Sequence, residues 1–234
     1  MTGTFINIVA ILIGSSLGLL FGSRLPARLK NTVTAGLGLF TLSIGISMFL
    51  KSEESLIVLG ALLIGAVLGE WWKIEEGLEN LGIWLESRFG NGNSAEESNR
   101  FIRGFMTASL LFCIGPLAIL GSIQDGLVGD YELLAVKSVL DAFASLAFAS
   151  TLGIGVAFSA FAVFIYQGSI TLLAAQLNSI VTEPMMIEMT AVGGVILIGL
   201  SFSSLLEIKK IRIGSFLPAL AIAPLIVWVL SLFP

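Results

Sequence analysis

Residues 5–22 read FINIVAILIGSSLGLLFG and contain no charged side chain. A transmembrane helix needs about 20 predominantly apolar residues to cross the hydrocarbon core of a bilayer, so this stretch is long enough for one crossing. Seven further apolar stretches approach the same length, at residues 32–50, 56–69, 101–120, 133–151, 154–177, 187–206 and 213–230. The sequence therefore predicts an all-α integral membrane protein, a polytopic bundle of about eight transmembrane helices.

The composition also indicates a membrane environment. Hydrophobic residues make up 56% of the chain and charged residues 12%, whereas a soluble domain usually carries about 25% charged residues. The apolar stretches recur along the whole length and leave no room for a separate soluble domain, so we interpret residues 1–234 as a single transmembrane domain. No basic segment precedes residue 5, which favours a first span over a cleavable signal peptide.

The distribution of basic residues predicts the orientation, because Lys and Arg near span ends favour the cytoplasmic side. With eight spans, most of the basic residues lie on one side, namely Arg24, Arg28, Lys30, Lys73, Arg88, Arg100, Arg103, Lys209, Lys210 and Arg212. The opposite loops are acidic, with Glu53, Glu54, Asp125, Asp130, Glu132, Glu183 and Glu188. We therefore expect both termini to face outward.

Residues 70–100 form the longest cytoplasmic segment, and their pattern predicts an amphipathic helix. Its apolar positions are Ile74, Leu78, Leu81 and Leu85, and its acidic positions are Glu75, Glu76, Glu79 and Glu86. The segment can cover the cytoplasmic ends of the spans or can dock a partner.

Two helix starts are also predicted. Ser52-Glu53-Glu54 is expected to cap the third span, and Ser94 with Glu97 has the spacing of a capping box.

Glycines at intervals of four mark faces for close helix packing. Gly14, Gly18 and Gly22 form one such face in the first span, and Gly65 and Gly69 form another in the third. We favour packing within one chain, although the motif is also compatible with a homodimer.

The fourth span is interrupted at Gly115-Pro116. Proline lacks a backbone N–H and breaks the helical hydrogen-bond pattern, so carbonyl groups lose their helical partners. A broken helix of this kind can line a transport cavity, where the freed carbonyls and helix ends coordinate a solute or ion. The alternative is an ordinary proline kink whose backbone groups are satisfied by neighbouring helices.

Lys137 and Asp141 are charges well inside an apolar stretch, and their spacing of four places them on one helix face. A charged residue at this depth should face the bundle interior or water. Counted along the helices, Asp141 and Gln167 lie at about the same depth, roughly 14 Å from the outer ends of their spans. We expect a polar site formed by Gly115, Pro116, Asp141 and Gln167. Its entrance would contain Lys137, Gln124 and Asp125, and the alternative is a purely structural Lys137–Asp141 ion pair.

Several classes of function are disfavoured. The net charge of −4 and the lack of a continuous basic surface argue against nucleic-acid binding. The chain has no histidine and one cysteine, Cys113, which removes the common zinc, haem and disulfide arrangements. Without histidine the usual general base is also missing. We expect no enzymatic activity, no cofactor and no resident metal.

The string Gly115-Pro116-Leu117-Ala118-Ile119-Leu120-Gly121-Ser122-Ile123-Gln124-Asp125-Gly126-Leu127, with Lys137-Ser138-Val139-Leu140-Asp141, resembles a bacterial inner-membrane family known as domain of unknown function 554. The opening Gly3-Thr4-Phe5-Ile6-Asn7 is similar to that family as well. Leu117 stands where the family's motif has methionine, which is a mild apolar exchange. The resemblance implies a bacterial inner-membrane protein with several spans, and it implies no particular substrate.

These observations predict a membrane transporter or channel-like pathway for a small polar solute or ion, with a cation slightly favoured. The acidic residues Asp125, Asp130 and Glu132 would give the outer entrance a negative potential. The alternative is a membrane assembly or sensor protein that does not transport and that docks a partner through residues 70–100.

Overall fold

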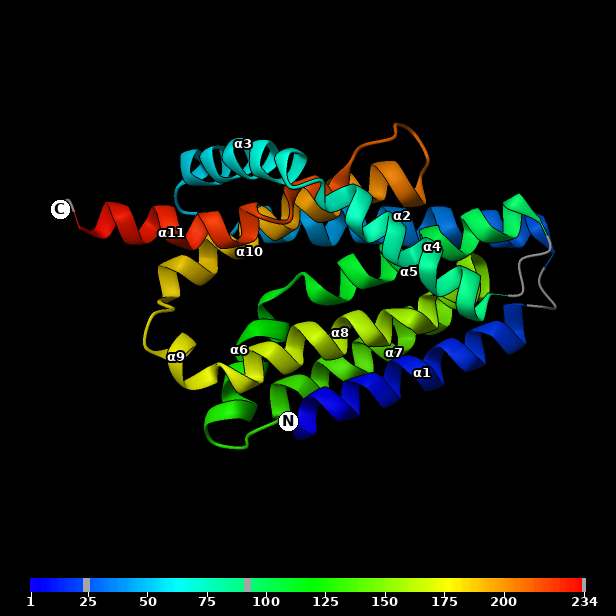
Figure 1. Ribbon diagram of the computed structural model, residues 1–234, viewed down its shortest axis with the longest axis horizontal. Helices are drawn as coiled ribbons and strands as arrows, with labels where there is room; N and C mark the ends of the chain where they lie inside the picture. Colours follow the sequence, from blue (N-terminus) through cyan, green and yellow to red (C-terminus); the bar gives the residue numbers. More distant parts are fainter. Residues whose placement is uncertain (23–25, 91–93, 233–234) are drawn as a thin grey trace. The chain divides into compact units, whose positions relative to one another are not determined.

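The computed structural model describes residues 1–22, 26–90 and 94–232, and every regular element within these ranges is a helix (Figure 1). Among the described residues, six helices are long and apolar enough to cross a membrane on their own. Two bent helix pairs raise this number to eight if each pair is one span. The structure therefore confirms an all-helical polytopic bundle, with six to eight spans.

The chain folds into two compact units, each assembled from two separate stretches. The first unit comprises Met1–Leu37 and Glu79–Ser179, and the second comprises Gly38–Leu78 and Ile180–Pro234. The division falls inside two helices, α2 (Ala27–Phe49) and α4 (Ile74–Phe89).

In the first unit, two long helices run side by side in the same direction. The helices of this unit are α1 (Thr2–Gly22), α5 (Ala95–Cys113), α6 (Pro116–Leu127), α7 (Glu132–Leu152), α8 (Gly155–Leu172) and the short α9 (Ala174–Asn178), together with the adjoining parts of α2 and α4. Near the start of α1, Gly3 faces Leu134 of α7, and at its end Gly22 faces Ser150. Helix α8 follows α7 after two residues and turns back, so it runs antiparallel to α1, and Gln167 near its end lies beside Asn7 near the start of α1. These directions agree with spans one, five and six of the predicted topology.

The second unit pairs its helices in antiparallel fashion. Its helices are α3 (Ser55–Trp71), α10 (Glu183–Leu200), a π-helical turn η1 (Ser201–Leu205), a 3-10 turn η2 (Ile213–Phe216) and α11 (Ala219–Ser231), with the adjoining parts of α2 and α4. Gly65 lies against Ala219 and Gly69 lies against Ser215, so α3 and α11 run in opposite directions. Gly45 of α2 packs on Gly194 of α10, where both backbones approach closely.

The start of α3 differs from the sequence prediction. No side chain of the Ser52-Glu53-Glu54 stretch caps this helix, and α3 begins at Ser55. The buried carboxylate of Glu188, on α10, instead accepts hydrogen bonds from the backbone N–H groups of Glu53 and Glu54 at 2.9 and 3.0 Å and from Ser52 Oγ at 2.7 Å. A carboxylate at a helix N-terminus is stabilising because it meets unpaired N–H groups and the positive end of the dipole.

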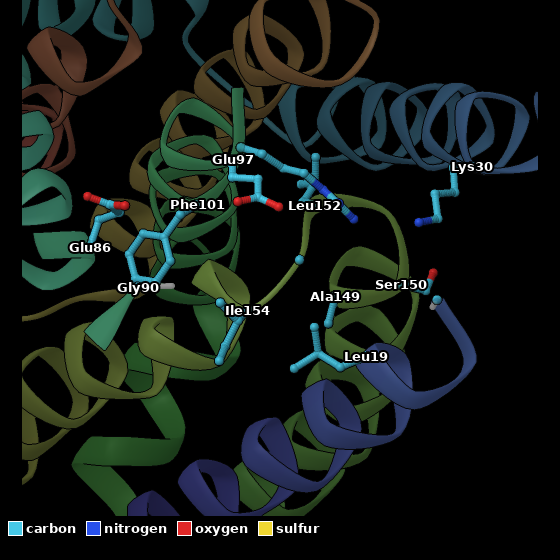
Figure 2. Close-up of a pocket in the computed structure, with 13 residues that line it drawn as sticks. Leu19, Lys30, Glu86, Gly90, Glu97, Phe101, Ala149, Ser150, Leu152 and Ile154 are labelled. Atoms are coloured by element: carbon cyan, nitrogen blue, oxygen red, sulfur yellow. The ribbon is translucent and has the colours of Figure 1, made fainter. Parts of the chain in front are cut away.

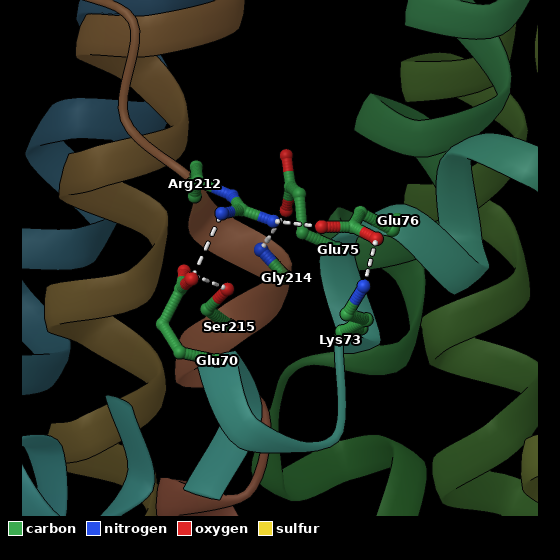
Figure 3. A network of polar contacts seen from close by, with 7 residues as sticks. All are labelled: Glu70, Lys73, Glu75, Glu76, Arg212, Gly214 and Ser215. Carbon is green, nitrogen blue, oxygen red and sulfur yellow. Dashed lines mark hydrogen bonds and ion pairs between the residues drawn. The ribbon is translucent and has the colours of Figure 1, made fainter. Parts of the chain in front are cut away.

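At the other end of the second unit, basic and acidic side chains from two loops meet (Figure 3). Arg212 binds Glu70 at 2.8 Å and Glu76 at 3.3 Å, and Lys73 pairs with Glu76 at 3.5 Å. Lys73 and Arg212 belong to two of the loops that the charge pattern assigns to one side of the membrane. Their meeting agrees with an even number of crossings between those loops. Arg24, in a third such loop, lies outside the described residues.

The part of α4 that belongs to the first unit, from Glu79 onward, packs its apolar side inside that unit. Leu85 is buried with Phe101 and Phe105 of α5, and Leu81 packs against the same cluster. The restart of the chain after α4 follows the predicted capping box, since Ser94 Oγ accepts a hydrogen bond from Glu97 N at 3.3 Å and α5 begins at Ala95. The amphipathic pattern of residues 74–86 is therefore explained by packing within the chain.

Candidate functional site

A buried polar cluster lies inside the first unit, where three helices contribute side chains to one point. Lys137 and Asp141 of α7 form an ion pair through Lys137 Nζ and Asp141 Oδ2. The same carboxylate oxygen accepts a hydrogen bond from Asn7 Nδ2 of α1 at 3.0 Å, and Asn7 Nδ2 also lies 3.4 Å from Gln167 Oε1 of α8. Asn7 and Gln167 are completely buried, and Lys137 and Asp141 are 6% and 7% exposed. We call these four residues the polar cluster.

The glycine face of α1 positions Asn7 against α7. A Cβ atom at Gly14 would clash with the Ala142 carbonyl oxygen and with Ser145, and one at Gly18 would clash with the Leu146 carbonyl oxygen. Only glycine allows the two backbones to approach this closely. Since the helices run parallel, the contacts of Gly3 with Leu134 and of Gly14 with Ala142 lie on either side of Asn7 and Asp141 and set the register at which they meet.

The polar cluster retains unused hydrogen-bonding capacity. Within the described part of the chain, Asn7 Oδ1 and Gln167 Nε2 are buried without a partner. An unpaired buried polar atom costs roughly 1–3 kcal/mol, and most buried polar atoms in proteins are paired. The cluster thus offers a free acceptor and a free donor, on two different helices, to any small group that reaches it.

A second set of buried polar atoms lies between the cluster and the end of the unit where α1 begins. Ser122 Oγ and Asp125 Oδ1 on α6, and Thr4 Oγ1 on α1, are also buried without partners among the described residues. Asp125 itself is held, because its other oxygen accepts from Gly3 N at 3.0 Å and lies 3.1 Å from the Met1 ammonium. Thr4 and Asn7 are three residues apart and share one face of α1.

The predicted helix break is present between α5 and α6, which are bent by 62°. Gly115 has φ +151°, a conformation that residues with a Cβ rarely adopt, and it precedes Pro116 at the start of α6. Ile114 is extended, so the backbone leaves the helical path for two residues. The last turn of α5 lies close to the ion pair, since Lys137 Nζ is 6.0 Å from the centre of the Phe112 ring.

The structure brings together some of the sequence-predicted residues and not others. Lys137, Asp141 and Gln167 meet in the polar cluster. Asp125 is buried near the start of α1, whereas Gln124 is exposed and does not join the buried groups. The predicted packing glycines of α1 lie on α7, and those of α3 lie on α11 and the turn before it.

Sequence reasoning missed Asn7, the residue that connects the ion pair to α8. Asn7 is the only side-chain amide in the first apolar stretch, which was the available signal. Its neighbours could not be inferred, because the rotation of α1 relative to α7 depends on the packing of the two helices. Among the described residues, no group of three or more His, Cys, Asp and Glu side chains is arranged to hold a metal ion.

The fold and the polar cluster define a polytopic helical membrane protein with charged and amide side chains buried between its helices. Comparison with known sequences assigns the family: residues 2–228 match the family described as "Protein of unknown function (DUF554)". The chain belongs to this family, which confirms the resemblance seen in the Gly115–Asp141 block.

Two relatives share about a third of the sequence over nearly their full length. The "Uncharacterized membrane protein YdfK" of Bacillus subtilis (strain 168) is 33% identical over 237 residues, covering 100% of this chain and 98% of that protein. The "Uncharacterized protein YqgA" of Escherichia coli (strain K12) is 33% identical over 221 residues, covering 94% of each chain. No solved structure matches the chain.

Proposed function

We propose that the chain forms a pathway across the membrane for a small polar solute or ion, with a cation favoured, and that the polar cluster is the site the permeating species contacts. The observation that carries this proposal is the buried Lys137–Asp141 pair joined to Asn7 and Gln167, two amides that each keep an atom without a partner among the described residues. Charged groups inside a membrane bundle are expensive and usually mark ion or substrate pathways.

The partly satisfied polar groups support a pathway over a purely structural ion pair. A structural pair is expected to have its remaining hydrogen-bonding sites satisfied by the protein, because unpaired atoms in a low-dielectric interior are costly. Among the described residues, further buried atoms without partners are found on Thr4, Ser122 and Asp125, toward the start of α1. A solute or ion passing along these atoms could exchange part of its hydration for contacts with them.

Oxygen chemistry and the acidic residues near the entrance favour a cation, although Lys137 balances Asp141 and the Met1 ammonium balances Asp125. Asp141 and Asp125 contribute carboxylates, and Asn7 Oδ1 adds a neutral oxygen that is unpaired among the described residues. Oxygen ligands of this kind suit hard cations. Asp130, in the loop between α6 and α7, and Glu132, the first residue of α7, would raise the local concentration of cations near Asp125.

The positive-inside pattern supports a finer assignment, a bacterial inner-membrane protein with both termini outward. In that orientation Asp125 lies toward the outside. The basic residues Lys30, Lys73, Arg100 and Arg212 lie toward the cytoplasm. The docking alternative has less support, because the apolar side of α4 packs on α5 and because Glu75 and Glu76 bind Gly214 and Arg212. The glycine faces are used inside the chain and give no support for a homodimer.

Flux through liposomes tests this proposal. The purified protein is reconstituted at equal density as wild type, Asp141→Asn and Glu79→Gln, and uptake of Na⁺, K⁺, Mg²⁺ and Mn²⁺ is measured. Glu79 is an exposed carboxylate on α4, so its replacement matches the change in charge outside the site. We expect flux of at least one cation in wild type and Glu79→Gln, and its loss in Asp141→Asn. Equal flux in all three proteins would contradict a role of the polar cluster, and absence of flux in all three would favour the docking alternative.

A further inference from the structure

A pocket of 310 Å³ lies in the first unit, at the end opposite Asp125 (Figure 2). Several helices end or begin around it: α1, α4 and α7 reach it with their last turns, and α2, α5 and α8 reach it with their first turns. Ends of membrane-spanning helices lie near the boundary between the hydrocarbon core and water. The pocket is therefore at the depth where the headgroups of phospholipids are found.

The lining of the pocket combines apolar walls with charges of both signs. Leu19, Leu152 and Ile154 are among its apolar residues, and Lys30, Arg100, Glu86 and Glu97 are its charged residues. Figure 2 shows Lys30 on one side, Glu86 on the opposite side and Glu97 between them. Arg100 is anchored through Nε, which donates to the Thr151 carbonyl oxygen at 2.9 Å. This anchor keeps the guanidinium group at the pocket.

We propose that this pocket binds the headgroup of a zwitterionic phospholipid with a primary ammonium group, that is, a phosphatidylethanolamine. Lys30 and Arg100 bind the phosphate, Glu86 binds the ammonium group, and the apolar residues contact the glycerol and upper acyl region. The charge pattern selects this class of lipid. Arg and Lys form strong charge-assisted hydrogen bonds with phosphate, and an ammonium group can donate up to three hydrogen bonds to carboxylates.

Other common headgroups fit the same charges less well. The glycerol headgroup of an anionic lipid places no positive charge near Glu86, so this carboxylate would repel its phosphate. A choline headgroup carries a positive charge but has no N–H to donate, so it cannot form hydrogen bonds with Glu86. The volume of the pocket lies at the low end of the range for small-molecule sites, roughly 300–1,000 Å³, which suits a headgroup better than a whole lipid.

The test measures lipid binding to the purified full-length protein in mild detergent by native mass spectrometry, with phosphatidylethanolamine, phosphatidylcholine and phosphatidylglycerol of identical acyl chains. We expect wild type to bind phosphatidylethanolamine about tenfold more tightly than either other lipid, as expected for one charge-assisted contact. Glu86→Gln should remove the preference over phosphatidylcholine, and Lys30→Gln should weaken both zwitterionic lipids. Two exposed residues of α4 outside the pocket supply matched controls, Glu79→Gln and Arg88→Gln, which should leave the preference unchanged.

Two results would overturn the proposal. The first is equal affinity of wild type for the three lipids, which would indicate ordinary annular lipid. The second is displacement of bound phosphatidylethanolamine by equimolar soluble glycerophosphoethanolamine, which would assign the pocket to a water-soluble zwitterion. Retention of folding in the variants is checked by thermal unfolding in the same detergent. Neither the proposal nor its test depends on transport, so a negative flux result leaves this inference standing.

Discussion

Lys137 and Asp141 are charged side chains buried inside the bundle, where a charge without a partner is costly. Both are more than nine-tenths buried in an otherwise apolar bundle, and both charges need a partner. Asn7 adds a hydrogen bond to the Asp141 carboxylate, which stabilises its charged form. Removing one charge leaves the other uncompensated, whereas removing both avoids this cost.

This difference predicts a non-additive effect on stability. Lys137→Met and Asp141→Asn should each lower the free energy of unfolding by about 3–5 kcal/mol, the usual cost of breaking a buried ion pair from one side. The double variant should be more stable than either single variant, because no unpaired charge remains. Unfolding in detergent, followed by circular dichroism, checks this. Additive losses in the double variant would show that the two side chains do not act as a pair.

At the scale of helices, the close contact of α1 and α7 determines where Asn7 lies. The backbone oxygens of Ala142, Leu146 and Ser150 occupy the space next to Gly14, Gly18 and Gly22, respectively. Because the contact runs along most of α1, a shift of one residue would clash at several points. The register of the polar cluster is thus a consequence of the glycine face.

Gly14→Ala is expected to separate α1 from α7 and to lower stability by about 1–3 kcal/mol, as in other overpacked interiors. Gly36→Ala on α2 is the matched control, since a Cβ at Gly36 meets no atom of the described residues within 4 Å. It should be neutral or slightly stabilising, because alanine has the higher helix propensity. Thermal unfolding of both variants beside wild type is the measurement. Equal unfolding temperatures for the two variants would mean that the tight contact does not contribute to stability.

At the break between α5 and α6, backbone conformation predicts a difference in stability between two glycine-to-alanine variants. Gly115→Ala should lower the free energy of unfolding by about 1–3 kcal/mol, because the φ of +151° is strained for any residue with a Cβ. In the part of the chain that the structure describes, no atom lies within 4 Å of a Cβ at Gly115, so crowding does not explain the loss. Gly77→Ala, inside α4 and equally uncrowded, should not be destabilising. If Gly115→Ala behaved like Gly77→Ala, the strained turn would not be a feature of the protein in solution.

The helices could be predicted from the sequence because they depend on residues that are close together in the chain. Apolar length predicted the spans, and the break at Gly115-Pro116 and the Ser94 cap followed from backbone chemistry. Lys137 and Asp141 were identified as charges inside an apolar stretch, and Gln167 by its matching depth. Asn7 and the capping carboxylate of Glu188 required knowledge of how helices rotate against one another, since their partners are more than a hundred residues away in the chain. Such contacts arise from packing and leave no periodic pattern.

For the whole molecule, orientation is the property that distinguishes an outer entrance near Asp125 from an inner one. In a Cys113→Ser background, which removes the only native thiol, we expect Asp130→Cys to react with a membrane-impermeant thiol reagent added to intact cells. Lys73→Cys should react only after the membrane is opened, because the basic loops are predicted to be cytoplasmic. Labelling with the opposite sidedness would place Asp125 toward the cytoplasm and would reverse the proposed entrance.

The most direct test of the proposed pathway is whether water-soluble reagents reach the polar cluster. In the same Cys113→Ser background, Ser138→Cys introduces a thiol beside Lys137 on the buried face of α7, and Val139→Cys introduces one on the exposed face of that helix. If a hydrated pathway leads to the polar cluster, a small charged thiol reagent should modify Ser138→Cys much faster than Val139→Cys. Modification of Ser138→Cys at or below the rate of Val139→Cys would contradict a pathway and would leave the ion pair with a structural role.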